Sequence, residues 1–162
     1  MPKMKVLVTG GAGYIGSHVV EHLLEYGYDV VVFDRVKEHS QAEYIIGDLN
    51  DKDLLDFVFQ KNQFDAVLHF AGSIEAGESM KNPSAFFQNN VVNGIYLLDM
   101  MVKHKVGNII FSSSAAVYAA KNGLLNETDT LAPENFYGQT KLKFEELLQW
   151  YHKIHGIKSI SL

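Results

Sequence analysis

The chain has 162 residues, of which 47% are hydrophobic and 20% are charged; these values exclude intrinsic disorder and collagen-like repeats and predict one folded domain. Its formal net charge is −5, with 14 Lys and Arg against 19 Asp and Glu, so neither nucleic acid nor an anionic membrane surface is an expected partner. The chain contains no cysteine, which excludes disulfide bonds and cysteine-ligated metals.

Short apolar runs rich in β-branched residues alternate with longer amphipathic segments. The runs predict strands at residues 4–8, 29–33, 44–46, 66–70, 108–112 and 158–162. The amphipathic segments predict helices at residues 14–26, 51–60, 83–104 and 137–155. Strands that alternate with helices require right-handed crossovers. We therefore expect an α/β fold: a Rossmann-type doubly wound parallel sheet of about six strands with helices on both faces, forming a single domain over residues 1–162.

The N-terminal residues lead directly into the first predicted strand. They lack the apolar stretch and small-residue cleavage site of a signal peptide. No later apolar run approaches the ~20 residues that a membrane span needs. The sequence therefore predicts a soluble, cytoplasmic protein.

Three glycines, Gly10, Gly13 and Gly16, follow the first predicted strand at intervals of three residues. This is a variant of the Gly-x-Gly-x-x-Gly fingerprint, in which glycine permits a tight turn, close approach of a pyrophosphate and close helix packing. The amides at the start of the following helix favour a diphosphate anion. By itself such a motif can also be a plain strand-to-helix turn, but here a strand precedes it and a helix follows. The pattern predicts a dinucleotide site.

The second predicted strand leads into Asp34, where the fingerprint expects an acidic residue that accepts hydrogen bonds from the adenosine ribose. A carboxylate repels a 2′-phosphate, so NAD is favoured over NADP. Arg35 follows at once, and we interpret it as a solvated side chain that lies over the adenine.

A second group of polar residues follows later strands. Ser112 and Ser114 come after the fifth strand, and Tyr137 and Lys141 stand at i and i+4 on one face of the last helix. A nearby ammonium stabilises a phenolate, which makes Tyr137 a usable acid or base. The Tyr-x-x-x-Lys spacing alone is weak evidence, but with the glycine motif and the serines at a strand end it predicts a catalytic site.

Together these motifs resemble the N-terminal part of the extended short-chain dehydrogenase/reductase family, and most of all its UDP-glucose 4-epimerases. Further family-like segments occur in the same order along the whole chain: Gly47-Asp48-Leu49, His69-Phe70-Ala71-Gly72, Gly77-Glu78-Ser79, Asn89-Asn90 and Ser112-Ser113-Ser114-Ala115-Ala116-Val117-Tyr118.

The resemblance implies NAD as the cofactor and assigns roles to individual residues. The implied catalytic residues are Ser114, Tyr137 and Lys141. The implied cofactor-binding residues are Gly10, Gly13, Tyr14, Ile15, Gly16, Asp34, Arg35, Asp48, Leu49, Phe70, Ala71, Gly72, Asn89, Ser112, Tyr137 and Lys141.

The implied activity is epimerisation of a nucleotide sugar, most closely the interconversion of UDP-glucose and UDP-galactose, by transient oxidation at sugar C4. The family's substrate-binding portion follows the sixth strand and has no counterpart here, so we expect this chain to bind NAD with little turnover. Two alternatives remain open: a non-catalytic NAD-binding module, and another member of the family that acts on a nucleotide sugar. A 4,6-dehydratase is disfavoured because Ala115 and Ala116 stand where such enzymes carry an Asp-Glu pair.

The seven histidines do not predict a metal site. His18 and His22 stand at i and i+4, but no third ligand is expected to converge on them.

Family members often form homodimers through their long helices, which correspond here to residues 83–104 and 137–155. The expected partners are therefore a UDP-hexose substrate and a second copy of the chain.

Overall fold

Six strands form one parallel sheet in this computed structural model, which describes residues 3–37 and 41–162. In chain order they are β1 (Lys5–Thr9), β2 (Asp29–Asp34), β3 (Glu43–Ile46), β4 (Ala66–His69), β5 (Asn108–Phe111) and β6 (Lys158–Ser161). The spatial order is β3-β2-β1-β4-β5-β6, and all neighbouring strands run parallel. The predicted Rossmann-type sheet is confirmed, and its winding reverses between β1 and β4, where such folds bind ligands.

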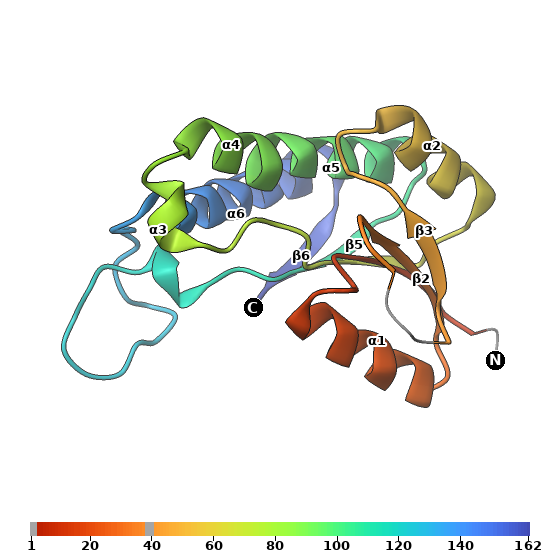
Figure 1. Cartoon of the computed structure of the whole chain (residues 1–162), viewed down its shortest axis with the longest axis horizontal. Coiled ribbons are helices and arrows are strands. Elements are labelled where there is room, and N and C mark those ends of the chain that lie inside the picture. The colour runs from red at the N-terminus through yellow and green to blue at the C-terminus, as the bar shows by residue number, and fades with distance from the viewer. Residues whose placement is uncertain (1–2, 38–40) are drawn as a thin grey trace.

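The helices cover the two faces of the sheet unequally. Helix α1 (Tyr14–Glu25) lies on one face, and α2 (Lys52–Lys61), α5 (Asn93–Lys103) and α6 (Phe136–His155) lie on the other (Figure 1). This division follows from right-handed crossovers, because β1 to β2 runs one way across the sheet and β3 to β4 to β5 to β6 runs the other. None of the helices in the described part of the chain is long and apolar enough to cross a membrane.

The helix predicted over residues 83–104 is interrupted. It consists of α4 (Pro83–Phe87), a π-helical turn η1 (Gln88–Val92) and α5. In the wide turn, Asn90 is buried and bonds both the N–H and the C=O of Ser73 in the loop after β4. Such bonds to another segment are invisible to periodicity, which explains why the sequence predicts one regular helix here. The short helices α3 (Ala76–Ser79) and η2 (Ala115–Val117) were also not predicted.

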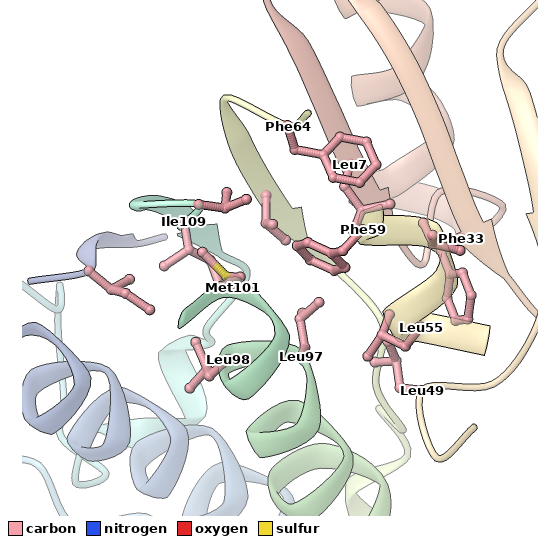
Figure 2. Close-up of a cluster of buried hydrophobic side chains, with 14 of the residues drawn as sticks. Leu7, Phe33, Leu49, Leu55, Phe59, Phe64, Leu97, Leu98, Met101 and Ile109 are labelled. Atoms are coloured by element: carbon pink, nitrogen blue, oxygen red, sulfur yellow. The ribbon is translucent and has the colours of Figure 1, made fainter. Parts of the chain in front are cut away.

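Two apolar cores hold the layers together. The smaller one joins α1 to the sheet through Val20 and five strand residues: Val6, Val8, Val30, Val32 and Leu68. The larger one lies under α2, α5 and α6 and includes Phe144. Leu55 and Leu97 belong to the same cluster (Figure 2). The central strands are buried on both faces, as their continuous apolar sequences predict, whereas β6 is an exposed edge strand.

Helices α5 and α6 approach closely because Gly94 has no side chain. A Cβ at Gly94 would lie 2.3 Å from Cε2 of Phe144, and the ring of Phe144 is fully buried against Phe111 and His69. The ring therefore cannot move aside at low cost.

We expect Gly94→Ala to lower the free energy of unfolding by about 1–3 kcal/mol, since the added methyl overpacks a closed core. Gly107→Ala is the matched control, because nothing lies within 4 Å of a Cβ at that position. Urea unfolding of both variants checks this, and equal stability of the two would contradict the packing argument.

Candidate functional site

Side chains have no room at Gly10, in the turn between β1 and α1, or at Gly16, in the first turn of α1. Gly10 has φ 74°, in the left-handed region, and a Cβ there would lie 2.4 Å from the backbone nitrogen of Ala71. A Cβ at Gly16 would lie 2.1 Å from the carbonyl oxygen of Gly10. The first turn of α1 is thereby pressed against the end of β1 and the loop after β4.

A cavity of about 400 Å³ opens beside this turn, at the carboxyl edge of the sheet. Ten of the residues predicted to contact the cofactor line it: Gly10, Gly13, Asp34, Arg35, Asp48, Leu49, Phe70, Ala71, Gly72 and Asn89. Five lining residues were not predicted, namely Ala12, Phe33, Val36, Gly47 and Ser73. Each of these is a chain neighbour of a predicted residue, which is the signal that would have found it.

The remaining predicted residues lie outside this lining. Tyr14, Ile15 and Gly16 form the first turn of α1, and the side chains of Tyr14 and Ile15 are exposed. The groups of that turn that suit an anion in the cavity are its backbone amides. Ser112, Tyr137 and Lys141 lie farther along the same edge of the sheet, after β5 and in α6.

Asp34 joins the end of β2 to the glycine turn. Its Oδ2 accepts a hydrogen bond from the N–H of Ala12 (2.9 Å), and its Oδ1 accepts one from the N–H of Val36 (3.3 Å). The carboxylate is therefore fixed at the wall of the cavity, on the strand next to β1.

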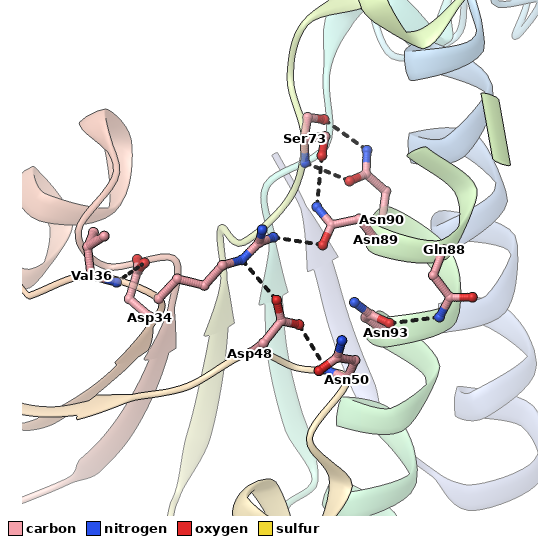
Figure 3. A network of polar contacts seen from close by, with 10 residues as sticks. Asp34, Val36, Asp48, Asn50, Ser73, Gln88, Asn89, Asn90 and Asn93 are labelled. Atoms are coloured by element: carbon pink, nitrogen blue, oxygen red, sulfur yellow. Dashed lines mark hydrogen bonds and ion pairs between the residues drawn. The ribbon is translucent and has the colours of Figure 1, made fainter. Parts of the chain in front are cut away.

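A chain of polar contacts links the wall formed by β2 to the π turn (Figure 3). Arg35 pairs with Asp48 (Nε to Oδ2, 3.1 Å) and donates to Oδ1 of Asn89 (2.8 Å). Asn89 in turn donates to Oγ of Ser73 (2.8 Å). All four residues line the cavity, so these contacts connect its separate walls. The sequence does not predict them, because they join four segments that are distant in the chain.

Lys141 lies close to two of the other predicted residues. Its Nζ donates to the carbonyl oxygen of Ser112 (2.8 Å) and lies 5.8 Å from the centre of the Tyr137 ring. The side chain is almost completely buried, and burial lowers the pKa of its amine to about 8. The amine is therefore mostly protonated at pH 7 and loses its proton as the pH rises through about 8.

The backbone of Tyr137 is held from both sides by buried hydroxyl groups. Its N–H donates to Oγ of Ser79 (2.9 Å), and its carbonyl oxygen accepts from Oγ1 of Thr140 (2.7 Å). Thr140 also accepts from Nδ2 of Asn90 (3.1 Å). The first turn of α6 is thus tied to α3 and to the π turn, which fixes the position of Tyr137.

Ser114 lies at the start of η2, where its Oγ accepts the N–H of Ala116 (3.1 Å). This segment packs against the first turn of α6, because Gly138 leaves room for it: a Cβ there would lie 2.2 Å from the carbonyl oxygen of Ala116. The segment with Ser114 and the turn with Tyr137 therefore lie side by side.

A buried histidine, His69, lies near Lys141. His69, at the end of β4, is hydrogen-bonded through Nδ1 to Oγ1 of Thr9 (2.6 Å) and packs on Phe111 and Phe144. Burial, together with the nearby Lys141 ammonium, lowers the pKa of its ring to about 3. His69 is therefore neutral at physiological pH. Its sequence context predicts no role for it.

No group of three His, Cys, Asp or Glu side chains in residues 3–37 and 41–162 is arranged to hold a metal ion. His18 and His22 are exposed and lie beside Glu21 (3.9 Å) and Glu25 (3.2 Å), respectively.

The parallel sheet with a reversal of winding, the glycine turn and the acidic residue at the end of β2 define a Rossmann-type dinucleotide-binding architecture. The chain belongs to the NAD dependent epimerase/dehydratase family, whose sequence profile matches residues 6–162.

Relatives and solved structures agree with this assignment. The UDP-glucose 4-epimerase of Halalkalibacterium halodurans is 42% identical over 98% of this chain and 49% of its own length. The crystal structure of UDP-glucose 4-epimerase from Brucella ovis in complex with NAD superimposes with a TM-score of 0.92 and 36% identity, over 98% of this chain and 50% of that one. The enzyme from Bifidobacterium longum, solved with NAD+ and UDP, matches with a TM-score of 0.91 and 36% identity, over 98% and 52%. The chain thus spans about half the length of these relatives.

We expect acid to destabilise the protein through His69. In the unfolded chain a histidine has a pKa of about 6.5, whereas in the fold it is about 3. Between these values the unfolded state binds the extra proton, so the contribution of His69 is complete above about pH 6.5 and is lost as pH falls toward 3.

His69→Gln, whose neutral amide can still bond Thr9, should flatten this dependence. The check is urea unfolding of both proteins at several pH values from 7.5 to 4.5 (about one unit apart). Parallel stability curves for the two would show that His69 does not titrate in this way.

Proposed function

We propose that the chain binds NAD in the cavity between the glycine turn, β2 and the loop after β4. The observation that carries this proposal is the close packing of backbone in this turn: Gly10 and Gly16 have no room for a Cβ, so the start of α1 is held against the end of β1, beside a fixed carboxylate at Asp34. Superimposable epimerase structures in complex with NAD support this choice of ligand.

Each part of the dinucleotide has candidate partners in the chain. Amides of the first turn of α1, at Tyr14, Ile15 and Gly16, would hold the diphosphate. Gly13 would lie beside it as the residue before the helix, since its own N–H donates to the carbonyl oxygen of Gly10 (3.1 Å). Asp34 would accept from the adenosine ribose, with Arg35, Asp48 and Leu49 around the adenine. Phe70, Ala71, Gly72 and Asn89 would line the path toward the nicotinamide, where Ser112, Tyr137 and Lys141 lie. This set fits the cavity lining and extends beyond it along the same sheet edge.

For the full-length protein we propose epimerisation of a UDP-hexose, most closely of UDP-glucose and UDP-galactose at C4. The identity to UDP-glucose 4-epimerases over nearly the whole chain supports this. When bound, NAD would accept hydride from the sugar and return it to the opposite face.

In this proposal the chain's own residues move and hold the proton. Tyr137 takes the proton of the C4 hydroxyl and later returns it, and Ser114 orients that oxygen. The Lys141 ammonium, whose Nζ is 5.8 Å from the ring of Tyr137 and 2.8 Å from the carbonyl oxygen of Ser112, stabilises the phenolate and donates to the nicotinamide ribose. Hydrogen bonds from the backbone of Tyr137 to Ser79 and from Thr140 to that backbone hold Tyr137 in position.

A non-catalytic NAD-binding module remains the second candidate for this chain, which spans half of its relatives. The burial of Lys141 beside Tyr137 favours the catalytic proposal, because buried ionisable groups with shifted pKa values cluster at functional sites.

Association of two chains through the long helices stays a prediction. Trp150 and Ile154 are exposed on α6, where such a contact would form.

Isothermal titration of the chain with NAD should show saturable binding. Gly16→Ala should weaken it at least tenfold, because the added Cβ would lie 2.1 Å from the Gly10 carbonyl oxygen and must displace the α1 amides. Gly107→Ala is the control and should bind normally. If the unaltered chain gave no binding heat with NAD, the proposed NAD site would be wrong. It would also be wrong if the Gly16→Ala variant bound NAD as tightly as the unaltered chain.

Interconversion of UDP-glucose and UDP-galactose by the chain alone should be slight. Tyr137→Phe in the full-length protein should lower turnover by roughly 10²–10⁴-fold, the contribution of a general acid or base, with little change in NAD affinity. Turnover is measured with each UDP-hexose, and undiminished activity of Tyr137→Phe would remove Tyr137 from its role. Rapid turnover by the 162-residue chain would contradict the expectation for the fragment.

A further inference from the structure

The guanidinium of Arg35 is engaged in two directions at the mouth of the cavity. Its Nε lies 3.1 Å from Oδ2 of Asp48, and its Nη2 donates to Oδ1 of Asn89 at 2.8 Å. Asp48 follows β3 and Asn89 lies in the π turn, on the opposite side of the opening (Figure 3). The planar fork of N–H donors on arginine suits such a double contact.

The position of Arg35 relates it directly to the ribose end of the proposed ligand. It follows Asp34, the residue that would accept from the adenosine ribose hydroxyls. A phosphate on the 2′ oxygen of that ribose would therefore meet the same wall of the cavity. In this fold an arginine near that position is what accommodates a 2′-phosphate, through charge-assisted hydrogen bonds.

The charges on this wall do not balance. Asp34 and Asp48 carry two negative charges, and Arg35 carries one positive charge. Both oxygens of Asp34 accept backbone amides, so its carboxylate is fixed. The charge of Arg35 is paired with Asp48, which leaves a net negative wall.

We propose that Asp48 sets the dinucleotide preference of this cavity, because its carboxylate engages the guanidinium that a 2′-phosphate would need. The inference rests on the proposed NAD site and adds a determinant of its specificity. Asp34 repels the 2′-phosphate directly. Asp48 acts by pairing with Arg35, which is the one cationic side chain that lines the cavity within residues 3–37 and 41–162.

Asp48→Asn isolates this effect. The amide has the shape of the carboxylate and can still accept the N–H of Asn50, which now donates to Oδ1 of Asp48 at 3.0 Å. The turn after β3 is therefore retained while the charge on Arg35 is released. Asp53→Asn, at an exposed position on α2 outside the cavity lining, removes the same charge without touching Arg35.

The experiment measures dissociation constants of NAD and NADP for the purified chain by isothermal titration at one fixed ionic strength. In Asp48→Asn, the ratio of the NADP constant to the NAD constant should fall roughly fivefold, the upper end for an exposed ion pair. NAD should still bind more tightly, because Asp34 is unchanged. Asp53→Asn should leave the ratio as it is in the unaltered chain.

A double-variant cycle tests whether Arg35 is the mediator. In an Arg35→Ala background, Asp48→Asn should no longer change the ratio, since no guanidinium is left to release. Asp48→Ala must shift the ratio in the same direction as Asp48→Asn, and thermal melting verifies that each variant is folded.

An unchanged ratio in both folded Asp48 variants would overturn the inference, as would an equal change in the Arg35→Ala background. NAD binding with an unchanged ratio rejects this inference alone. Failure of the unaltered chain to bind either dinucleotide rejects the proposed function and this inference with it.

Discussion

The carboxyl edge of the sheet, where the cavity opens, depends on a steric constraint at the turn that follows β1. A side chain at Gly10 or Gly16 would overlap the backbone of Ala71 or of Gly10 itself. Because that space is occupied by main chain, α1 starts directly against the end of β1, and the loop after β4 passes beside both. Three backbone segments therefore meet where the winding of the sheet reverses, and the N-terminus of α1, whose first amides have no partner within the helix, lies at this meeting point.

The rest of the edge is fastened to this point by polar side chains rather than by the apolar core. Asn90 bonds the backbone of Ser73 and the hydroxyl of Thr140, and Thr140 bonds the backbone of Tyr137. The loop that lines the cavity and the helix that carries Tyr137 are thus joined through one buried amide. A displacement of the π turn would move the cofactor wall and the proposed acid-base residue together.

Burial adjusts the charges at this edge. Lys141 and His69 are both bases with pKa values below their ordinary range because they are buried. The consequence differs between them: the amine stays mostly charged at neutral pH, and the imidazole is neutral. A single ammonium therefore remains among these buried groups, with its Nζ bonded to the carbonyl of Ser112.

Much of the fold was predictable because it depends on local patterns. Apolar runs placed all six strands, and the amphipathic period placed α1, α2 and α6 to within a residue or two of their ends. The glycine spacing indicated the turn, and the i, i+4 spacing indicated that Tyr137 and Lys141 share a helix face. The predicted roles of these site residues are still predictions.

What the sequence did not predict arises from contacts between distant segments. Asn90 in the π turn at residues 88–92 bonds Ser73, and Arg35 pairs with Asp48 and Asn89. The role of Ser79 also emerges only from the structure, since its partner Tyr137 lies 58 positions away in the chain. Periodicity and motif spacing carry no information about such pairs.

The most direct test of the account is a crystal structure of the chain grown with NAD. We predict that the diphosphate oxygens lie within hydrogen-bond distance of backbone amides in the turn from Gly13 to Gly16, with Asp34 on the adenosine ribose. An NAD molecule bound elsewhere on the chain, or a diphosphate that makes no contact with that turn, would contradict the claim that this steric constraint creates the site.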